Sequence, residues 1–186
     1  MGWFRKPATT EPYSRYGVHL VTVAAGDAAR VADSWHAGGI DLDWQQKFQV
    51  LYELVLYYLH ITDRYVAQHR PGQRQRIMDA VTGAAWYAWL TRSVVKPIPE
   101  DLSDPATVEN FRGFTEDLHL RHELYAPYVW ERADDPDNFE GTLFWEFPKF
   151  VSRSLGYPDD LITIMGVQMA MLNSLEFLNS AQLLDP

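Results

Sequence analysis

One stretch of this chain, residues 44–69, is patterned as a long helix with apolar side chains on nearly every face. A helix that is apolar all round normally lies inside a bundle, where other helices cover it. Between residues 48 and 66, four acidic, basic or histidine residues interrupt the apolar side chains, so the stretch lacks the run of ~18 apolar residues that a membrane span requires. They are Glu53, His60, Asp63 and Arg64. The stretch therefore predicts an all-α protein built around a central buried helix, from about residue 43 to 69, with no membrane span.

The polar residues of this helix lie close to one line. Each residue of an α-helix is turned by about 100° from the last, so positions seven apart nearly coincide. Glu53 and His60 are seven apart, Tyr57 lies between them, and Asp63 and Arg64 follow within one turn. Buried ionisable groups must be paired, neutral or bound to a metal, because a lone buried charge is very costly. We expect a buried polar stripe in which Arg64 pairs with a carboxylate, and His60 bonds to Tyr57 or to a neighbouring helix.

The alternative interpretation of this stripe is a metal site. Glu116, His119 and Glu123 share one face of a second predicted helix, because they are three and four residues apart. Carboxylate-bridged di-iron bundles use Glu-x-x-His pairs of this spacing. Together with Glu53 and His60, these residues could form a dinuclear iron or manganese site of the oxidase or oxygenase kind. That constellation needs ligands from four helices, and here the last helix adds only Glu176, so a solvated helix face is the interpretation we favour for residues 116–123.

Caps and helix breakers predict the remaining elements. Asp43 and Gln46 have the spacing of a capping box, and Asp104 followed by Pro105 is typical of a helix start. Residues 18–24 also fit a strand, so the first helix could be broken there. Further helices are expected at residues 13–36, 73–95, 105–125, 138–155 and 158–183. The sequence thus predicts one domain, a bundle of five to six helices over residues 13–186, after an N-terminal arm at residues 1–12.

Composition restricts the possible functions. A chain of 186 residues suits a single domain. Its net charge of −9 argues against nucleic-acid binding, which requires a basic face. The chain has no cysteine, which excludes disulfides, thiol catalysis and cysteine-ligated metals and fits a cytoplasmic protein. Seven Trp, ten Tyr and nine Phe indicate a core or a contact surface built from large rings.

The sequence favours a non-catalytic helical protein that acts through protein–protein interaction or self-assembly, without a cofactor. No complete catalytic set is recognisable, and Trp and Tyr anchor protein interfaces more often than other residues. The aromatic residues expected at such an interface are Trp3, Phe4, Trp35, Trp130 and Trp145. The partner is therefore expected to be another protein or a second copy of the chain.

Overall fold

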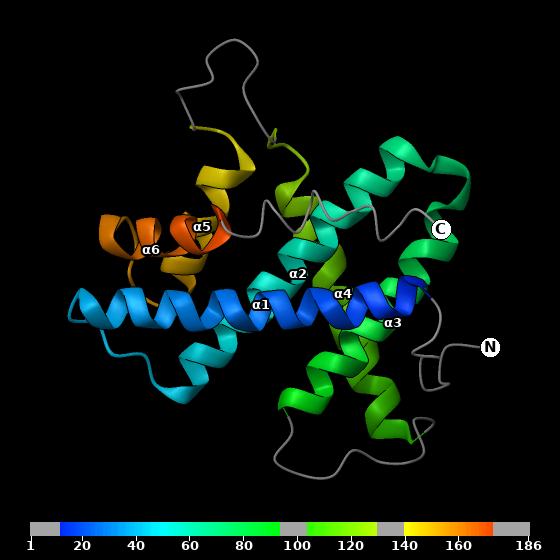
Figure 1. The fold of residues 1–186 in the computed structure, drawn as a ribbon, viewed down its shortest axis with the longest axis horizontal. Helices are drawn as coiled ribbons and strands as arrows, with labels where there is room; N and C mark the ends of the chain where they lie inside the picture. The colour runs from blue at the N-terminus through cyan, green and yellow to red at the C-terminus, as the bar shows by residue number, and fades with distance from the viewer. Residues whose placement is uncertain (1–11, 94–103, 130–139, 173–186) are drawn as a thin grey trace.

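The structure of this chain, a computed structural model, describes residues 12–93, 104–129 and 140–172. The secondary structure of these residues is almost entirely helical (Figure 1). The elements are α1 (Pro12–Ala37), α2 (Trp44–His69), the short 3-10 helix η1 (Pro71–Gln73), α3 (Arg74–Ser93), α4 (Pro105–Tyr125), α5 (Leu143–Ser154) and α6 (Leu161–Leu172). The predicted all-α bundle is therefore confirmed. Among the described residues, no helix combines the length and the hydropathy that crossing a bilayer requires.

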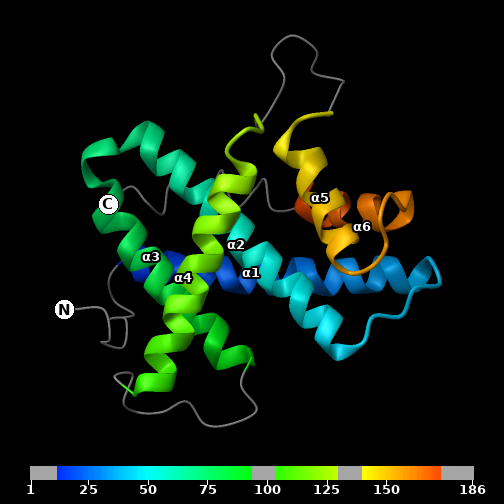
Figure 2. The same cartoon turned by 180° about the vertical axis from the view of Figure 1, so that it is seen from behind.

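Helix α2 is the centre of the bundle, as predicted. α1 crosses in front of it in Figure 1, and α4 crosses on the opposite side in Figure 2. Every residue from Glu53 to Asp63 is buried, so other helices cover this part of α2 all round. The expected capping box begins the helix, because Gln46 N donates to Asp43 Oδ1 at 2.8 Å and Asp43 N donates to Gln46 Oε1 at 3.0 Å. Pro71, which has no N–H to donate, follows its end.

Helix α1 is continuous, which decides the choice between helix and strand at residues 18–24. Its buried positions follow the helical period of three and four residues. They include Tyr16, Leu20, Ala24, Ala28, Val31 and Trp35. Gly17 lets α1 approach α3 closely, since a Cβ at this position would overlap the carbonyl oxygen of Val81. Alternation along a strand would have divided the buried positions between two faces.

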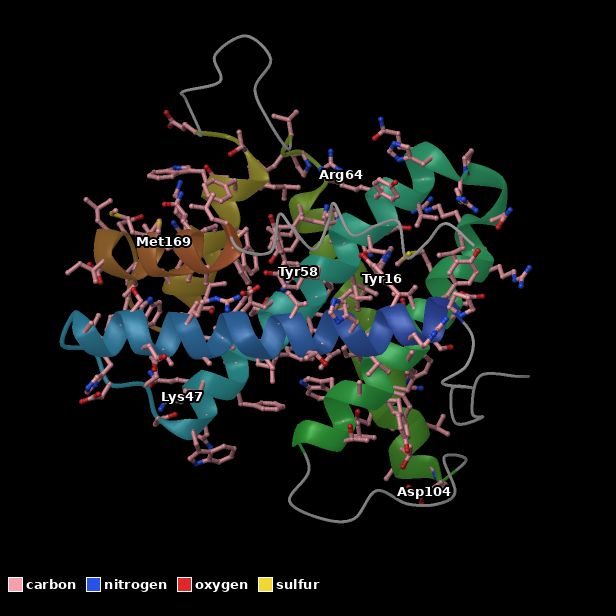
Figure 3. The ribbon with its side chains drawn as sticks, viewed as in Figure 1. Tyr16, Lys47, Tyr58, Arg64, Asp104 and Met169 are labelled. Carbon is pink, nitrogen blue, oxygen red and sulfur yellow. The ribbon has the colours of Figure 1, made fainter. Side chains whose placement is uncertain are left out.

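Polar contacts also join α1 to α2 where the two helices cross. Tyr16 and Tyr58, labelled in Figure 3, come from the two helices at this crossing. The hydroxyl of Tyr16 lies 3.2 Å from Thr62 Oγ1, and Tyr58 donates its hydroxyl proton to the fully buried carboxylate of Asp27. Burial raises the pKa of Tyr16 to about 12. These hydroxyls satisfy polar groups that the crossing removes from water.

The later helices differ from prediction mainly at their ends. α4 has the predicted bounds, and Thr107 N donates to its N-cap Asp104 at 3.1 Å. α5 begins five residues later than expected, because Thr142 is extended and Leu143 N donates to Val129 O at 2.8 Å. The expected end of the last helix, like the N-terminal arm as far as residue 11, lies outside the described residues.

Candidate functional site

The buried carboxylate of Glu53 is paired across the interface of α2 with α4. Arg121 donates to it twice, from Nε to Oε2 at 2.8 Å and from Nη2 to Oε1 at 2.7 Å. Gln49 Nε2 donates to Oε1 at 2.9 Å. The hydrogen bonds to Glu53 raise the pKa of the Arg121 guanidinium, which also lies 4.7 Å above the ring of Phe150. Such a bidentate, charge-assisted pair is among the strongest polar contacts available to a buried carboxylate.

Arg64 is not the partner of Glu53, and it is not buried. Its side chain is exposed at the edge of the bundle, and Nη1 donates to the backbone oxygen of Tyr128 at 2.7 Å (Figure 3). Position 64 lies one residue beyond the part of α2 that is covered all round. The predicted stripe therefore holds four buried residues, and Arg64 instead ties α2 to the chain after α4.

A second cluster of polar side chains, centred on Asp63, joins α2, α3 and α4. Arg74 donates to both carboxylate oxygens of Asp63, at 2.7 Å each. His122 Nδ1 lies 3.6 Å from Asp63 Oδ2 and 3.0 Å from His60 Nδ1. A carboxylate oxygen beside His122 Nδ1 favours a proton on that nitrogen. We therefore assign His122 as the donor and His60 Nδ1 as the acceptor, which puts the proton of His60 on Nε2.

Both imidazoles are neutral in this arrangement. Burial, together with the neighbouring His122 and Arg64, lowers the pKa of His60 to about 3, against the opposing effect of Asp63. Burial also lowers the pKa of His122, although Asp63 acts against this. Neutral rings suit a bond in which two Nδ1 atoms share a single proton, since two protonated nitrogens would repel each other.

Three buried polar atoms in this region have no hydrogen-bond partner in the described part of the chain. They are Tyr57 Oη, Tyr125 Oη and His60 Nε2. Their rings form one aromatic cluster, with centroids 6.0 Å apart for Tyr57 and Tyr125 and 5.4 Å apart for His60 and Tyr125. Phe147 of α5 stacks on Tyr57 at 4.1 Å. Burial raises the pKa of both tyrosines, so their hydroxyls stay protonated. Of the two partners expected for His60, the neighbouring helix is the one found, through His122 Nδ1 of α4, and the bond to Tyr57 does not form.

The residues of the alternative metal interpretation do not meet. Glu116, His119 and Glu123 are exposed on the outer face of α4, where His119 Nε2 lies 3.3 Å from Glu123 Oε1 and Arg112 Nε lies 3.7 Å from Glu116 Oε1. Glu53 and His60 face α4 from α2 and contact other residues of it. Within residues 12–93, 104–129 and 140–172, no group of three or more His, Asp or Glu side chains is arranged to hold a metal ion. Glu176 lies outside these ranges.

Sequence reasoning missed the residues of α4 and α3 that complete the polar cluster. Arg121, His122 and Arg74 supply the partners of the α2 side chains, and Asp117 accepts a hydrogen bond from Tyr52 at 2.6 Å. One signal could have found Arg121. Phe114, Leu118, Arg121 and Tyr125 follow one another at three- and four-residue spacing, and the apolar members mark the inward face.

Of the five aromatic residues predicted at an interface, the described part of the chain contains Trp35 and Trp145. Trp35 is fully buried, so its expected place on an exposed interface is wrong. Its indole fills the space beneath α6, and Nε1 donates to Thr163 O at 3.1 Å. Trp145 is half-buried. Trp3, Phe4 and Trp130 lie outside the described residues.

Helix α6 presents the most apolar exposed surface of the described chain. Five large apolar side chains on it are between 44% and 62% exposed, and Figure 3 labels one of them, Met169. They are Leu161, Ile162, Met165, Met169 and Leu172. The opposite face packs on α1 and α5 through Thr163, Ile164, Gly166, Val167, Ala170 and Met171. We call the five exposed side chains the α6 face.

No family model matches this chain, and neither a curated protein nor a solved structure matches it. In the cluster between α2 and α4, buried acids and bases are matched in pairs, which is typical of a structural network. On the α6 face, large apolar groups contact solvent, which is typical of a surface that another molecule covers.

Proposed function

We propose that this chain is a non-catalytic protein that acts through protein–protein contact, and that the α6 face is its contact surface. The supporting observation is that α6 is apolar on both sides although the described helices cover only one. The five exposed side chains fall within an arc of about 100°. An apolar stripe of that width is what a helix normally buries against a neighbour. A helix that is apolar all round needs cover on both sides.

The chemistry of the α6 face defines its partner. Residues 161–172 contain no charged side chain. The matching surface is the apolar face of an α-helix in a protein chain, because rows of side chains on two helices interlock without needing polar partners. Met165 and Met169 lie in the middle of the stripe, and flexible methionine side chains adapt to such a surface. A second exposed apolar pair, Leu120 and Leu124 on α4, lies among charged side chains and does not form a comparable stripe.

Oxidation of methionine side chains tests this proposal while the partner is still unidentified. Met165 and Met169 are exposed and Met171 of the same helix is buried, so peroxide should oxidise the first two faster in dilute purified protein. In intact cells, we expect Met165 and Met169 to be protected several-fold. The variant Leu120→Met adds an exposed reference methionine on α4, which should be oxidised alike in both settings. Equal oxidation of Met165 and Met169 in cells and in dilute protein would contradict the proposal.

A further inference from the structure

We propose that the partner on the α6 face is a second copy of this chain, whose α6 packs antiparallel across a two-fold axis that crosses the exposed stripe at the level of Val167. The inference rests on the proposed function, because it names the partner of the same surface.

The order of side chains along the stripe supports a two-fold contact. Four of the five side chains of the α6 face, Leu161, Met165, Met169 and Leu172, read Leu, Met, Met, Leu in either direction, and Ile162 lies at one edge of the stripe. In a two-fold interface, any contact of one residue with a second is repeated in reverse on the other side of the axis. Antiparallel packing therefore sets Leu161 against Leu172 of the second copy, and Met165 against Met169 of the second copy. Both pairs have their midpoint at or next to Val167, so one axis serves both.

Charge favours the antiparallel arrangement over a parallel one. Asp159 and Asp160 lie just before α6, and the side chain of Asp159 is 77% exposed, with Arg153 Nη2 3.8 Å from its Oδ1. A parallel pair would bring these carboxylates of both copies together at one end, whereas an antiparallel pair keeps them at opposite ends. Antiparallel packing also opposes the two helix dipoles.

The net charge of the chain also limits where two copies can meet. At −9, two copies repel each other, so a stable contact needs a surface without charged groups. The α6 face meets this condition.

The first experiment measures the mass of the full chain by size-exclusion chromatography with light scattering. Wild type should be a dimer, and the double variant Met165→Glu with Met169→Glu should be a monomer, because it places charges at the centre of the contact. Leu120→Glu makes the same kind of change on α4 and should remain a dimer. Circular dichroism reports whether each variant keeps its helical content.

The second experiment determines the arrangement of the two copies. The chain has no cysteine, so single cysteines can be added one at a time and joined by a short bifunctional thiol reagent. Two variants with tags of different mass are mixed. Leu161→Cys should cross-link with Leu172→Cys, and Met165→Cys with Met169→Cys. Leu161→Cys and Leu172→Cys should not cross-link with themselves. Self-cross-linking of these two end positions without the mixed products would overturn the antiparallel arrangement.

The outcomes separate this inference from the proposed function. A wild-type chain that stays monomeric at every concentration overturns the second copy as partner. If Met165 and Met169 are nevertheless protected in cells, the proposed function stands with a different protein on the α6 face. If they are not protected, both proposals are wrong. If the double glutamate variant loses its helical content, the cysteine pairs decide, because they change one side chain at a time and add no charge.

Discussion

Gly166 of α6 lies so close to Trp35 of α1 that a Cβ at position 166 would come within 2.8 Å of two indole atoms, Cδ1 and Nε1. The same indole nitrogen donates to Thr163 O at 3.1 Å. Glycine at position 166 thus allows α6 to approach α1 closely, and the hydrogen bond from Trp35 fixes the orientation of α6. Because this orientation is fixed, Met165 and Met169 point away from the bundle. The buried contact therefore determines which side of α6 is available to a partner.

Gly166→Ala should destabilise the fold. The added methyl group overlaps the ring of Trp35, and overpacking of this kind costs about 1–3 kcal/mol in the free energy of unfolding. Denaturation by urea, followed by circular dichroism, measures this loss. Gly113→Ala is the matched control, because a Cβ at that position of α4 meets nothing within 4 Å. It should stabilise the protein by roughly 0.5–1 kcal/mol, as alanine favours a helix. Similar effects of the two substitutions would contradict the close approach of α6 to α1.

The fold could largely be predicted because its signals are local. Each signal lies within a short stretch of sequence. Examples are the capping box at Asp43, the Asp104–Pro105 start of α4 and the helical period of α2. The predicted start of α5 is too early because the true start depends on a contact distant in sequence. Leu143 N bonds to Val129 O, and no pattern within residues 138–155 shows this.

The candidate site was harder to predict because it depends on which faces of different helices meet. The spacing of Glu53 and His60 shows that both need partners, but Arg121 and His122 become those partners only through the packing of α4 on α2. Trp35 was expected at an interface because of its residue type. Its spacing tells otherwise, since Trp35 continues the series of buried residues that runs from Leu20 along α1 at intervals of three and four residues. The exposed stripe on α6 resembles core sequence, and only the packing shows that the described helices leave one side of α6 uncovered.

Arg121→Leu should destabilise the protein strongly. It leaves the carboxylate of Glu53 fully buried without its positive partner, and breaking a buried pair costs about 3–5 kcal/mol. Denaturation by urea measures the loss. The double variant Glu53→Leu with Arg121→Leu should recover part of it, because no uncompensated charge is then buried.

The matched control for this pair lies on the same helix. Arg112 and Glu109 form an exposed ion pair, with both side chains 64% exposed. Arg112→Leu should change the stability by less than about 1 kcal/mol, as is usual for surface pairs. If Arg121→Leu costs no more than Arg112→Leu, Arg121 does not compensate a buried charge.

Two adjacent tyrosines of α2 should respond in opposite ways to loss of the hydroxyl. Tyr57 Oη is buried without a partner in the described part of the chain, and an unsatisfied group of this kind costs about 1–3 kcal/mol. Tyr57→Phe should therefore leave the protein as stable as wild type or more stable. Tyr58→Phe removes a hydrogen bond to buried Asp27 and should destabilise by about 1–3 kcal/mol. Melting temperatures of the two variants, compared with wild type, test this order. Equal losses would show that Tyr57 Oη has a partner after all.

The stability of the protein should fall as the pH drops below 6.5, because of His60 and His122. The pKa of His60 is lowered from 6.5 to about 3, and that of His122 is lowered too, so between these values the unfolded chain binds more protons than the folded one. Stability then decreases with falling pH, by up to about 1.4 kcal/mol per pH unit for each histidine. Around His60, Asp63 opposes this shift, whereas His122 and Arg64 add to it.

Denaturation by urea between about pH 5 and pH 7.5 isolates this effect, because most carboxylates stay ionised there. His60→Gln removes one of the two titrating groups and retains an amide that can accept from His122 Nδ1, so the slope of stability against pH below 6.5 should be shallower than in wild type. Above pH 6.5, the curves of wild type and variant should run parallel, because the imidazoles are neutral in both the folded and the unfolded chain. If His60→Gln keeps the wild-type slope, or if wild type gains stability on acidification in this range, the two imidazoles are not held neutral by burial between α2 and α4.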